Sequence, residues 1–179
     1  MSKAMQIGRP HPSTHSILVD DVWKKPNGGR LKLNTNESLD EVNNVTGLGW
    51  VLRDDEGRFL ACKGMCVTGC YGVKEVEAVC IREALSWLKG TGMGDVDVET
   101  DSQLVYFALC QNFFNSAFGF IIYDVKEVAS MINDVHFYFA KQSANRAAIL
   151  LLGRPFLCQV AGSGLMPLLL SLLIVFLMI

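Results

Sequence analysis

Two neighbouring segments, KEVEAVCIREALSWLK (residues 74–89) and VETDSQLV (98–105), decide the fold predicted for this chain. The first has helical periodicity, and its apolar stripe consists of Ile81, Ala84, Leu85 and Leu88. The second begins in a strand, because residues 96–100 alternate, and continues into a helix for which Ser102 is a suitable N-cap. A helix followed directly by a buried strand is typical of α/β proteins.

Each of these segments carries one acidic residue at a notable position. Glu77 lies one helical turn before Ile81 on the apolar stripe, and Asp101 stands where the strand of residues 96–100 ends. Active sites of open α/β sheets gather at the carboxyl ends of strands, so both acids are candidates for a functional site. Purely structural explanations are also open. Glu77 would then reach solvent from the start of the helix, and Asp101 would cap the next helix.

The sequence before residue 74 predicts three strands. In LKLNTN (31–36), Leu31, Leu33 and Thr35 alternate with Lys32, Asn34 and Asn36, so the strand has two different faces. The segment GLGWVLRDDEGRFLACKGMCV (47–67) predicts two further strands around a turn at residues 54–57.

The sequence after Asp101 predicts two helices, a strand and a last helix. The two helices are expected in residues 102–111 and 118–133, and the strand in residues 136–141. The last helix opens at SANRAA (143–148). The full order is three strands, helix, strand, two helices, strand and helix. It predicts an α/β fold with a mixed five-stranded sheet and helices on both faces.

Composition limits the classes of function. The chain has 179 residues, half of them hydrophobic, and a formal net charge of -2, which fits one domain rather than a strongly basic nucleic-acid-binding protein. A basic run at Lys24, Lys25, Arg30 and Lys32 has no acid among it. That run is either a solvated face or a contact for a phosphate backbone.

The six cysteines do not indicate a disulfide scaffold. No stretch near Met1 combines basic residues, an apolar run and a cleavage site, so the sequence predicts an intracellular protein with reduced thiols. The spacing of Cys62, Cys66 and Cys70 does not match common zinc sites, and buried strand cysteines are the preferred interpretation.

Both ends of the chain differ from its centre. Residues 1–22 are polar and without periodicity, which predicts a mobile leader. Residues 153–179 form an apolar tail, and the run LMPLLLSLLIVFLMI (165–179) is shorter than the roughly 20 residues of a membrane span. We prefer an accident of reading frame or gene model as its origin, with a membrane anchor as the alternative.

The strings LKLN, GWVLRDDEGRFL, EAVCIREALSWLK, VETDSQLV, FGFIIYDVKEV and SANRAA, in this order, resemble the plant ribonuclease H-like domain of retroelement origin. This type is associated with reverse transcriptases, and the likeness covers about residues 23–152. It implies a ribonuclease H-like fold that cuts the RNA strand of RNA/DNA hybrids. It also implies a carboxylate site for two divalent ions, usually Mg²⁺ with Mn²⁺ as an alternative.

The four acid positions of that family fall on Asn36, Glu77, Asp101 and Ile149. Glu77 and Asp101 match and are the metal ligands that the resemblance implies, whereas Asn36 and Ile149 lack the carboxylate. Two nearby acids could supply the carboxylate that Asn36 lacks. Strand alternation is expected to turn Glu37 to the opposite sheet face, and Asp40 lies in the loop that follows the strand. The expected function is a hybrid ribonuclease with impaired catalysis. The alternative is a catalytically dead domain that binds nucleic acid or a tail-anchored interaction protein.

Overall fold

The computed structural model describes residues 24–69, 71–111 and 116–141. Within them, three strands come first, β1 (Leu31–Asp40), β2 (Val45–Arg53) and β3 (Phe59–Thr68). They are followed by α1 (Val73–Thr91), β4 (Val96–Thr100), α2 (Gln103–Cys110), α3 (Ala117–Ser130) and β5 (Val135–Phe139). The predicted element order is confirmed as far as β5, and the last predicted helix lies outside the described residues.

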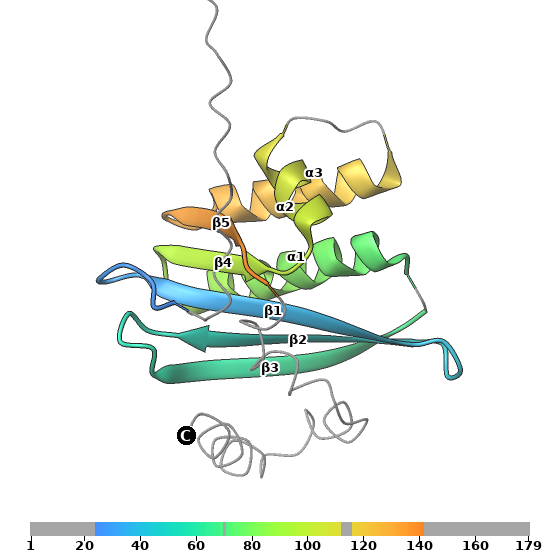
Figure 1. Cartoon of the computed structure of the whole chain (residues 1–179), viewed down its shortest axis with the longest axis horizontal. Coiled ribbons are helices and arrows are strands. Elements are labelled where there is room, and N and C mark those ends of the chain that lie inside the picture. Colours follow the sequence, from blue (N-terminus) through green and yellow to red (C-terminus); the bar gives the residue numbers. More distant parts are fainter. Residues whose placement is uncertain (1–23, 70, 112–115, 142–179) are drawn as a thin grey trace, which may run out of the picture.

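The five strands form one mixed sheet in the order β3-β2-β1-β4-β5 (Figure 1). β1 pairs with β2 and β2 with β3 in antiparallel fashion, whereas β4 is parallel to both β1 and β5. The parallel pairing of β1 with β4 ends at Asn34 and Glu99, although β1 continues to Asp40. The two central strands therefore part at their carboxyl ends, which is where a site is expected in an open sheet.

The main apolar core lies between one face of the sheet and the three described helices, and a small second cluster consists of Val51 with Phe59 and Cys62. The sheet supplies alternate residues, among them Leu33 from β1, Trp50 from β2 and Val98 from β4, all fully buried. α1 supplies the predicted stripe, and α2 and α3 contribute Val105 and Ile122. The described helices thus share one face. Helices on both faces stay a prediction, since the last predicted helix, which opens at residues 143–148, lies outside the described residues.

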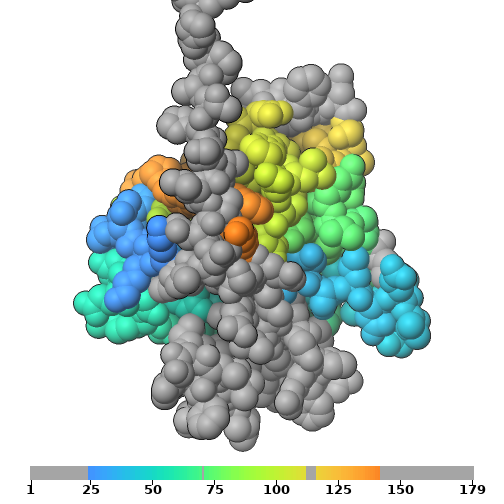
Figure 2. All heavy atoms as spheres, in the orientation of Figure 1, coloured from blue at the N-terminus to red at the C-terminus, as the bar shows by residue number. Residues whose placement is uncertain are grey.

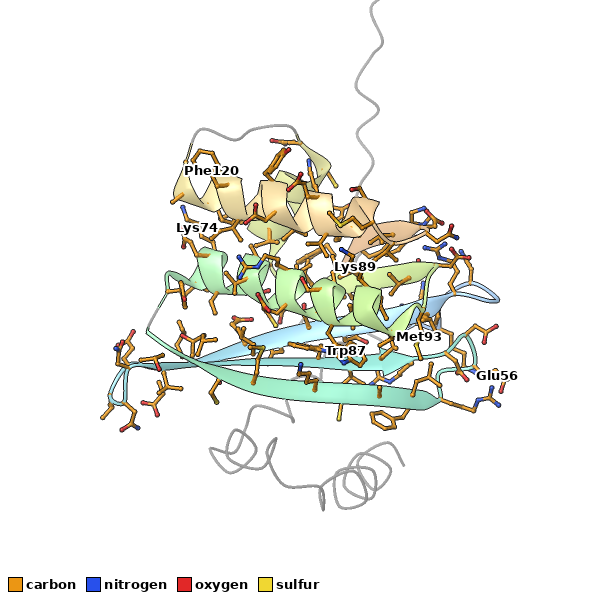
Figure 3. The ribbon with its side chains drawn as sticks, turned by 180° about the vertical axis from the view of Figure 1, so that it is seen from behind. Glu56, Lys74, Trp87, Lys89, Met93 and Phe120 are labelled. Carbon is orange, nitrogen blue, oxygen red and sulfur yellow. The ribbon has the colours of Figure 1, made fainter. Side chains whose placement is uncertain are left out.

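α1 lies along the sheet and contacts it with the face that carries the apolar stripe. Figure 3 labels Lys74 and Lys89 near its two ends and Trp87 on the side toward the strands. The ring of Trp87 is tilted against that of Trp50, with 6.1 Å between centroids. The helix ends at Gly92, whose positive φ of 72° lets its N–H reach the carbonyl of Lys89.

The opposite face of the central strands carries a buried polar network. Glu99 accepts hydrogen bonds from Lys32 Nζ (2.6 Å) and Asn34 Nδ2 (2.7 Å), and Arg53 Nη1 donates to Asn34 Oδ1 (2.8 Å). Next to it, Arg30 Nε donates to Asp97 Oδ1 at 2.6 Å. The solvated-face interpretation of the basic run is therefore wrong for Lys32, which is 4% exposed, because acids of β4 lie beside it.

The hairpin tip between β1 and β2 extends beyond the helical layer, in blue and cyan at the right of Figure 2. Val42 at this tip is 94% exposed. No helix within residues 24–69, 71–111 and 116–141 is long and apolar enough to cross a bilayer.

Candidate active site

Glu77 lies in the second turn of α1 and faces the sheet. Its side chain is 4% exposed, and its Oε2 accepts a hydrogen bond from Thr100 Oγ1 at 3.2 Å. Thr100 is the last residue of β4, and its hydroxyl oxygen also accepts the N–H of Ser102 at 3.1 Å. The interpretation of Glu77 as a solvated helix-start residue is therefore wrong, because the carboxyl group is held at the carboxyl end of β4.

Asp101 follows β4 directly and interacts with Glu77 through its side chain. It does not cap α2. That role belongs to Ser102, whose Oγ accepts the N–H of Val105 at 3.4 Å. The structure thus brings together the two acids that the sequence singled out, and it gives the capping task to the neighbouring residue.

A third acid, Glu37, joins this pair from β1. Its side chain is hydrogen-bonded to that of Glu77, and the charge of Asp101 raises its pKa. β1 keeps an unbroken register with β2 from Lys32 to Asp40, so Glu37 shares the helix-facing side with Leu33 and Thr35. The expectation that alternation turns Glu37 away from the site is wrong, because α1 packs on the face that Leu33 and Thr35 define.

The three carboxyl groups perturb one another strongly. Burial, the charge of Glu37 and hydrogen bonding with Asp101 raise the pKa of Glu77 to about 10. Burial also raises the pKa of Glu37, against a lowering by its hydrogen bond with Glu77, and the charge of Asp101 adds to the rise. At neutral pH Glu77 therefore holds a proton, which allows two carboxyl groups to share a hydrogen bond.

Cys80 of α1, three residues after Glu77, contacts the backbone of β1. Its Sγ lies 3.3 Å from the carbonyl oxygen of Asn36 and 3.6 Å from that of Gly49, and the residue is fully buried. Burial raises the pKa of this thiol, so it stays protonated and serves as a donor. The contact holds the backbone of β1 against α1 about one helical turn after Glu77.

The remaining predicted site residues differ in outcome. Asn36 is 8% exposed, and among the described residues its side chain makes no hydrogen bond with Glu77 or Asp101. Asp40 accepts hydrogen bonds from the backbone N–H (3.0 Å) and Nδ2 (2.7 Å) of Asn43, so its carboxylate is used in the hairpin turn. Ile149 lies outside the described residues.

The donor chemistry of Glu37, Glu77 and Asp101 suits a hard divalent cation, because all three offer carboxyl oxygens. In the part of the chain that the structure describes, no group of three or more His, Cys, Asp or Glu side chains is placed so that it could hold a metal ion. The structure therefore shows Glu37, Glu77 and Asp101 as interacting acids and not as a metal site.

The cysteines of β3 take no part in this site. Cys62 is a half-buried free thiol whose pKa burial raises to about 11. Cys66 is disulfide-bonded, whereas Cys62, Cys80 and Cys110 are free, and Cys70 lies outside the described residues. The prediction of reduced thiols is wrong for Cys66. Sequence spacing does not show which sulfur atoms meet, since a disulfide requires two Cα atoms within about 7 Å in the fold.

Comparison with known proteins assigns the family. The model of reverse transcriptase-like proteins matches residues 34–152, about two thirds of the chain. This chain belongs to the reverse transcriptase-like family. The match begins in β1 and includes Asn36, Glu77, Asp101 and Ile149, the four positions discussed above. The search of curated proteins found no match.

Solved structures show the fold of this family member. Ribonuclease H1 from the archaeon Halobacterium salinarum aligns with a TM-score of 0.62 at 21% identity, covering 69% of this chain and 94% of that one. The ribonuclease H domain of a Mycobacterium tuberculosis protein aligns at 0.61 and 15%, covering 74% and 95%. LC11 ribonuclease H1, solved with an RNA/DNA hybrid, aligns at 0.60 and 17%, covering 68% and 93%.

A retroviral protein carries the same fold within a longer chain. The protease-reverse transcriptase of prototype foamy virus aligns with a TM-score of 0.52 at 18% identity, over 68% of this chain and 19% of that one. The predicted ribonuclease H-like fold and its link to reverse transcriptases are confirmed. The predicted plant origin and the boundaries 23–152 stay predictions.

Proposed function

We propose that this chain is a ribonuclease H-type domain that binds RNA/DNA hybrid and hydrolyses its RNA strand with the help of divalent metal, at a rate lowered by Asn36 and Ile149. The observation that carries the proposal is the meeting of Glu77 and Asp101 at the carboxyl end of β4, next to the point where β1 and β4 part. Carboxylates gathered at such a point are the usual means of holding a catalytic cation.

The residues that would hold the metal are Glu77 and Asp101. The ion would polarise the phosphate of the substrate and make a bound water molecule more acidic. Thr100 orients Glu77 through its hydroxyl, so one oxygen of that carboxyl group has a defined direction. Because Glu77 is protonated at neutral pH, it must release its proton before it acts as a ligand. Metal affinity should therefore rise with pH.

The substrate class follows from charge and fold. A site made of acids repels a phosphate backbone unless a cation lies between them, which favours a metal-bridged nucleic acid over a bare anion. The solved complex of LC11 ribonuclease H1 with an RNA/DNA hybrid supports that duplex as the ligand. Asn36 keeps a neutral oxygen where the family likeness implies an acid, which accounts for the lowered rate.

The test is cleavage of a labelled RNA/DNA hybrid by the full chain in Mg²⁺ and in Mn²⁺. We expect slow, metal-dependent cleavage that falls about 100-fold or more in Glu77→Gln and in Asp101→Asn, because ligands of one ion act as a unit. Asn36→Asp should raise the rate severalfold by adding an anionic oxygen. Glu56→Gln, in the exposed β2–β3 turn, is the matched control.

Two results would contradict the proposal. Cleavage that survives Asp101→Asn unchanged would remove these acids from the chemistry. Hybrid binding without cleavage in either metal, even after Asn36→Asp, would support the alternative of a catalytically dead nucleic-acid-binding domain.

A further inference from the structure

We propose that Thr100 is a positioning residue of this site, because its one hydroxyl group fixes the directions of both Glu77 and Asp101. This inference rests on the proposed function, since the directions of these acids matter for cleavage only if the acids carry the chemistry. It assigns a role to a neutral side chain that takes no part in breaking the bond itself.

The hydroxyl group of Thr100 acts as acceptor and donor at once. Its oxygen accepts the backbone N–H of Ser102 at 3.1 Å, and it donates its hydrogen to Oε2 of Glu77 at 3.2 Å. A hydroxyl group has only one hydrogen, so this hydrogen is committed to Glu77. The carboxyl group of Glu77 therefore has one oxygen directed at the end of β4, and it cannot rotate without losing this bond.

The bond from Ser102 places Asp101. It joins the side chain of Thr100 to the N–H two residues later, which closes a turn with Asp101 in its middle. α2 begins at Gln103, and the hydroxyl of Ser102 accepts the N–H of Val105, so the far side of the turn is held by the helix. Both ends of the turn are anchored, which limits the directions open to the Asp101 side chain.

Thr100 itself is held firmly. It is fully buried at the end of β4, and its carbonyl oxygen accepts the N–H of Ala140, just beyond β5, at 3.0 Å. A β-branched side chain has few rotamers, so the backbone sets the direction of the hydroxyl group. A valine at this position would keep the shape but would take an acceptor from the Ser102 N–H and a donor from Glu77.

The experiment compares Thr100→Val with Thr100→Ser and with Thr46→Val. Valine removes both hydrogen bonds of Thr100, whereas serine keeps a hydroxyl group for them. Thr46 is the matched control, because it is also a fully buried strand threonine and its hydroxyl donates to the carbonyl of Gly69 at 2.7 Å. It lies in β2, which carries none of the acids.

The first readout is steady-state cleavage of the RNA/DNA hybrid by the full chain in Mn²⁺. We expect Thr100→Val to lower kcat about 10-fold or more while KM for the hybrid changes less than about twofold, because the acids and not the substrate contacts are misplaced. Thr100→Ser should recover most of kcat, and Thr46→Val should leave it within about twofold. A merely structural role would not separate Thr100→Val from Thr46→Val in kcat.

The second readout does not depend on activity. Melting temperatures of Thr100→Val, Glu77→Leu and the double variant form a cycle, in which leucine removes the acceptor of the Thr100 hydroxyl. The two single shifts should not add, since the same bond is lost in each, whereas Thr46→Val and Glu77→Leu should be additive. Backbone amide exchange at Ser102 should be faster in Thr100→Val and unchanged in Thr100→Ser. If Thr100→Val does not fold, as judged by circular dichroism, Thr100→Cys takes its place, because a thiol is a weak donor and acceptor.

The outcomes separate the two proposals. If Glu77→Gln and Asp101→Asn abolish cleavage while Thr100→Val keeps its kcat, the positioning role is overturned and the proposed function stands. If the unmodified chain does not cleave the hybrid, the proposed function fails, and the cycle decides whether Thr100 holds the acids. Additive shifts in that cycle, or an equal loss of kcat in Thr100→Val and Thr46→Val, would overturn the inference.

Discussion

Glu77 shows how one residue combines structural cost with function. A carboxyl group that is 4% exposed would be unfavourable in a core unless it were neutral or paired, and here Glu37, Asp101 and the hydroxyl of Thr100 surround it. The proton that it retains makes the metal-free site tolerable. In the proposed function the same proton would have to leave before a cation is bound, which would link folding stability to metal binding through this side chain.

The first prediction at this scale concerns pH. The pKa of Glu77 is raised from 4.5 to about 10, so its contribution to stability is fully present below about pH 4.5 and is lost as pH rises through about 10. In metal-free buffer, the free energy of unfolding should therefore fall between about pH 5 and pH 9, on the order of 2–4 kcal/mol. Urea denaturation across this range measures it.

Glu77→Gln is the control, because an amide does not titrate. In this variant the fall of the free energy of unfolding with rising pH should largely disappear. The groups facing Glu77 are Glu37, Asp101 and Cys80, and they remain in the variant. Equal slopes for both proteins would mean that Glu77 is already ionised in the fold.

At the scale of elements, the pairing of β1 with β4 carries different chemistry on its two faces. The helix-facing side is apolar up to the acids, whereas the other side holds the network of Lys32, Asn34, Arg53 and Glu99. Burial lowers the pKa of Arg53, and the charge of Glu99 opposes that lowering. The network joins β2, β1 and β4 and aligns the two central strands just before they part at the site.

Lys32→Met should therefore destabilise the fold by about 2–4 kcal/mol, because Glu99 would stay buried without its 2.6 Å ion pair. The double variant Lys32→Met with Glu99→Leu should recover part of this loss, since no unpaired charge remains. Lys25→Met, at an exposed position of the same basic run, should change stability by less than about 0.5 kcal/mol. Chemical denaturation of the unmodified chain and the three variants measures these differences. If Lys32→Met is as stable as the unmodified chain, the ion pair is dispensable.

At the scale of the whole molecule, the family match ends at residue 152, before the apolar run of residues 165–179. We therefore expect the domain that carries the proposed site to fold without that run. A long apolar segment outside a domain is either bound to a membrane or a cause of aggregation.

Deleting residues 155–179 should leave the domain folded and increase its soluble fraction on expression. Circular dichroism and the melting temperature test the fold, and the fraction of protein in the supernatant tests solubility. A reporter fused to residues 155–179 that collects at one membrane would favour the anchor interpretation over an accident of the gene model. Loss of the folded state on deletion would show that the tail belongs to the domain.

The sequence by itself determined the order of the elements, the core-facing stripe of α1 and the candidacy of Glu77 and Asp101. These features depend on periodicity along a short stretch of chain, such as the spacing of Ile81, Ala84 and Leu88, and periodicity is a local property of the backbone. Alternation in residues 31–36 also separated the two faces of β1 correctly, because the strand has no bulge there.

Only the tertiary structure decided which face of β1 α1 covers, and hence that Glu37 rather than its neighbour meets Glu77. It likewise decided that Lys32 is paired with Glu99, 67 residues away, and is not solvated. Both outcomes depend on which strands pair and where they part. Such contacts join residues far apart in the chain, and the side-chain pattern of either segment alone carries no record of its partner.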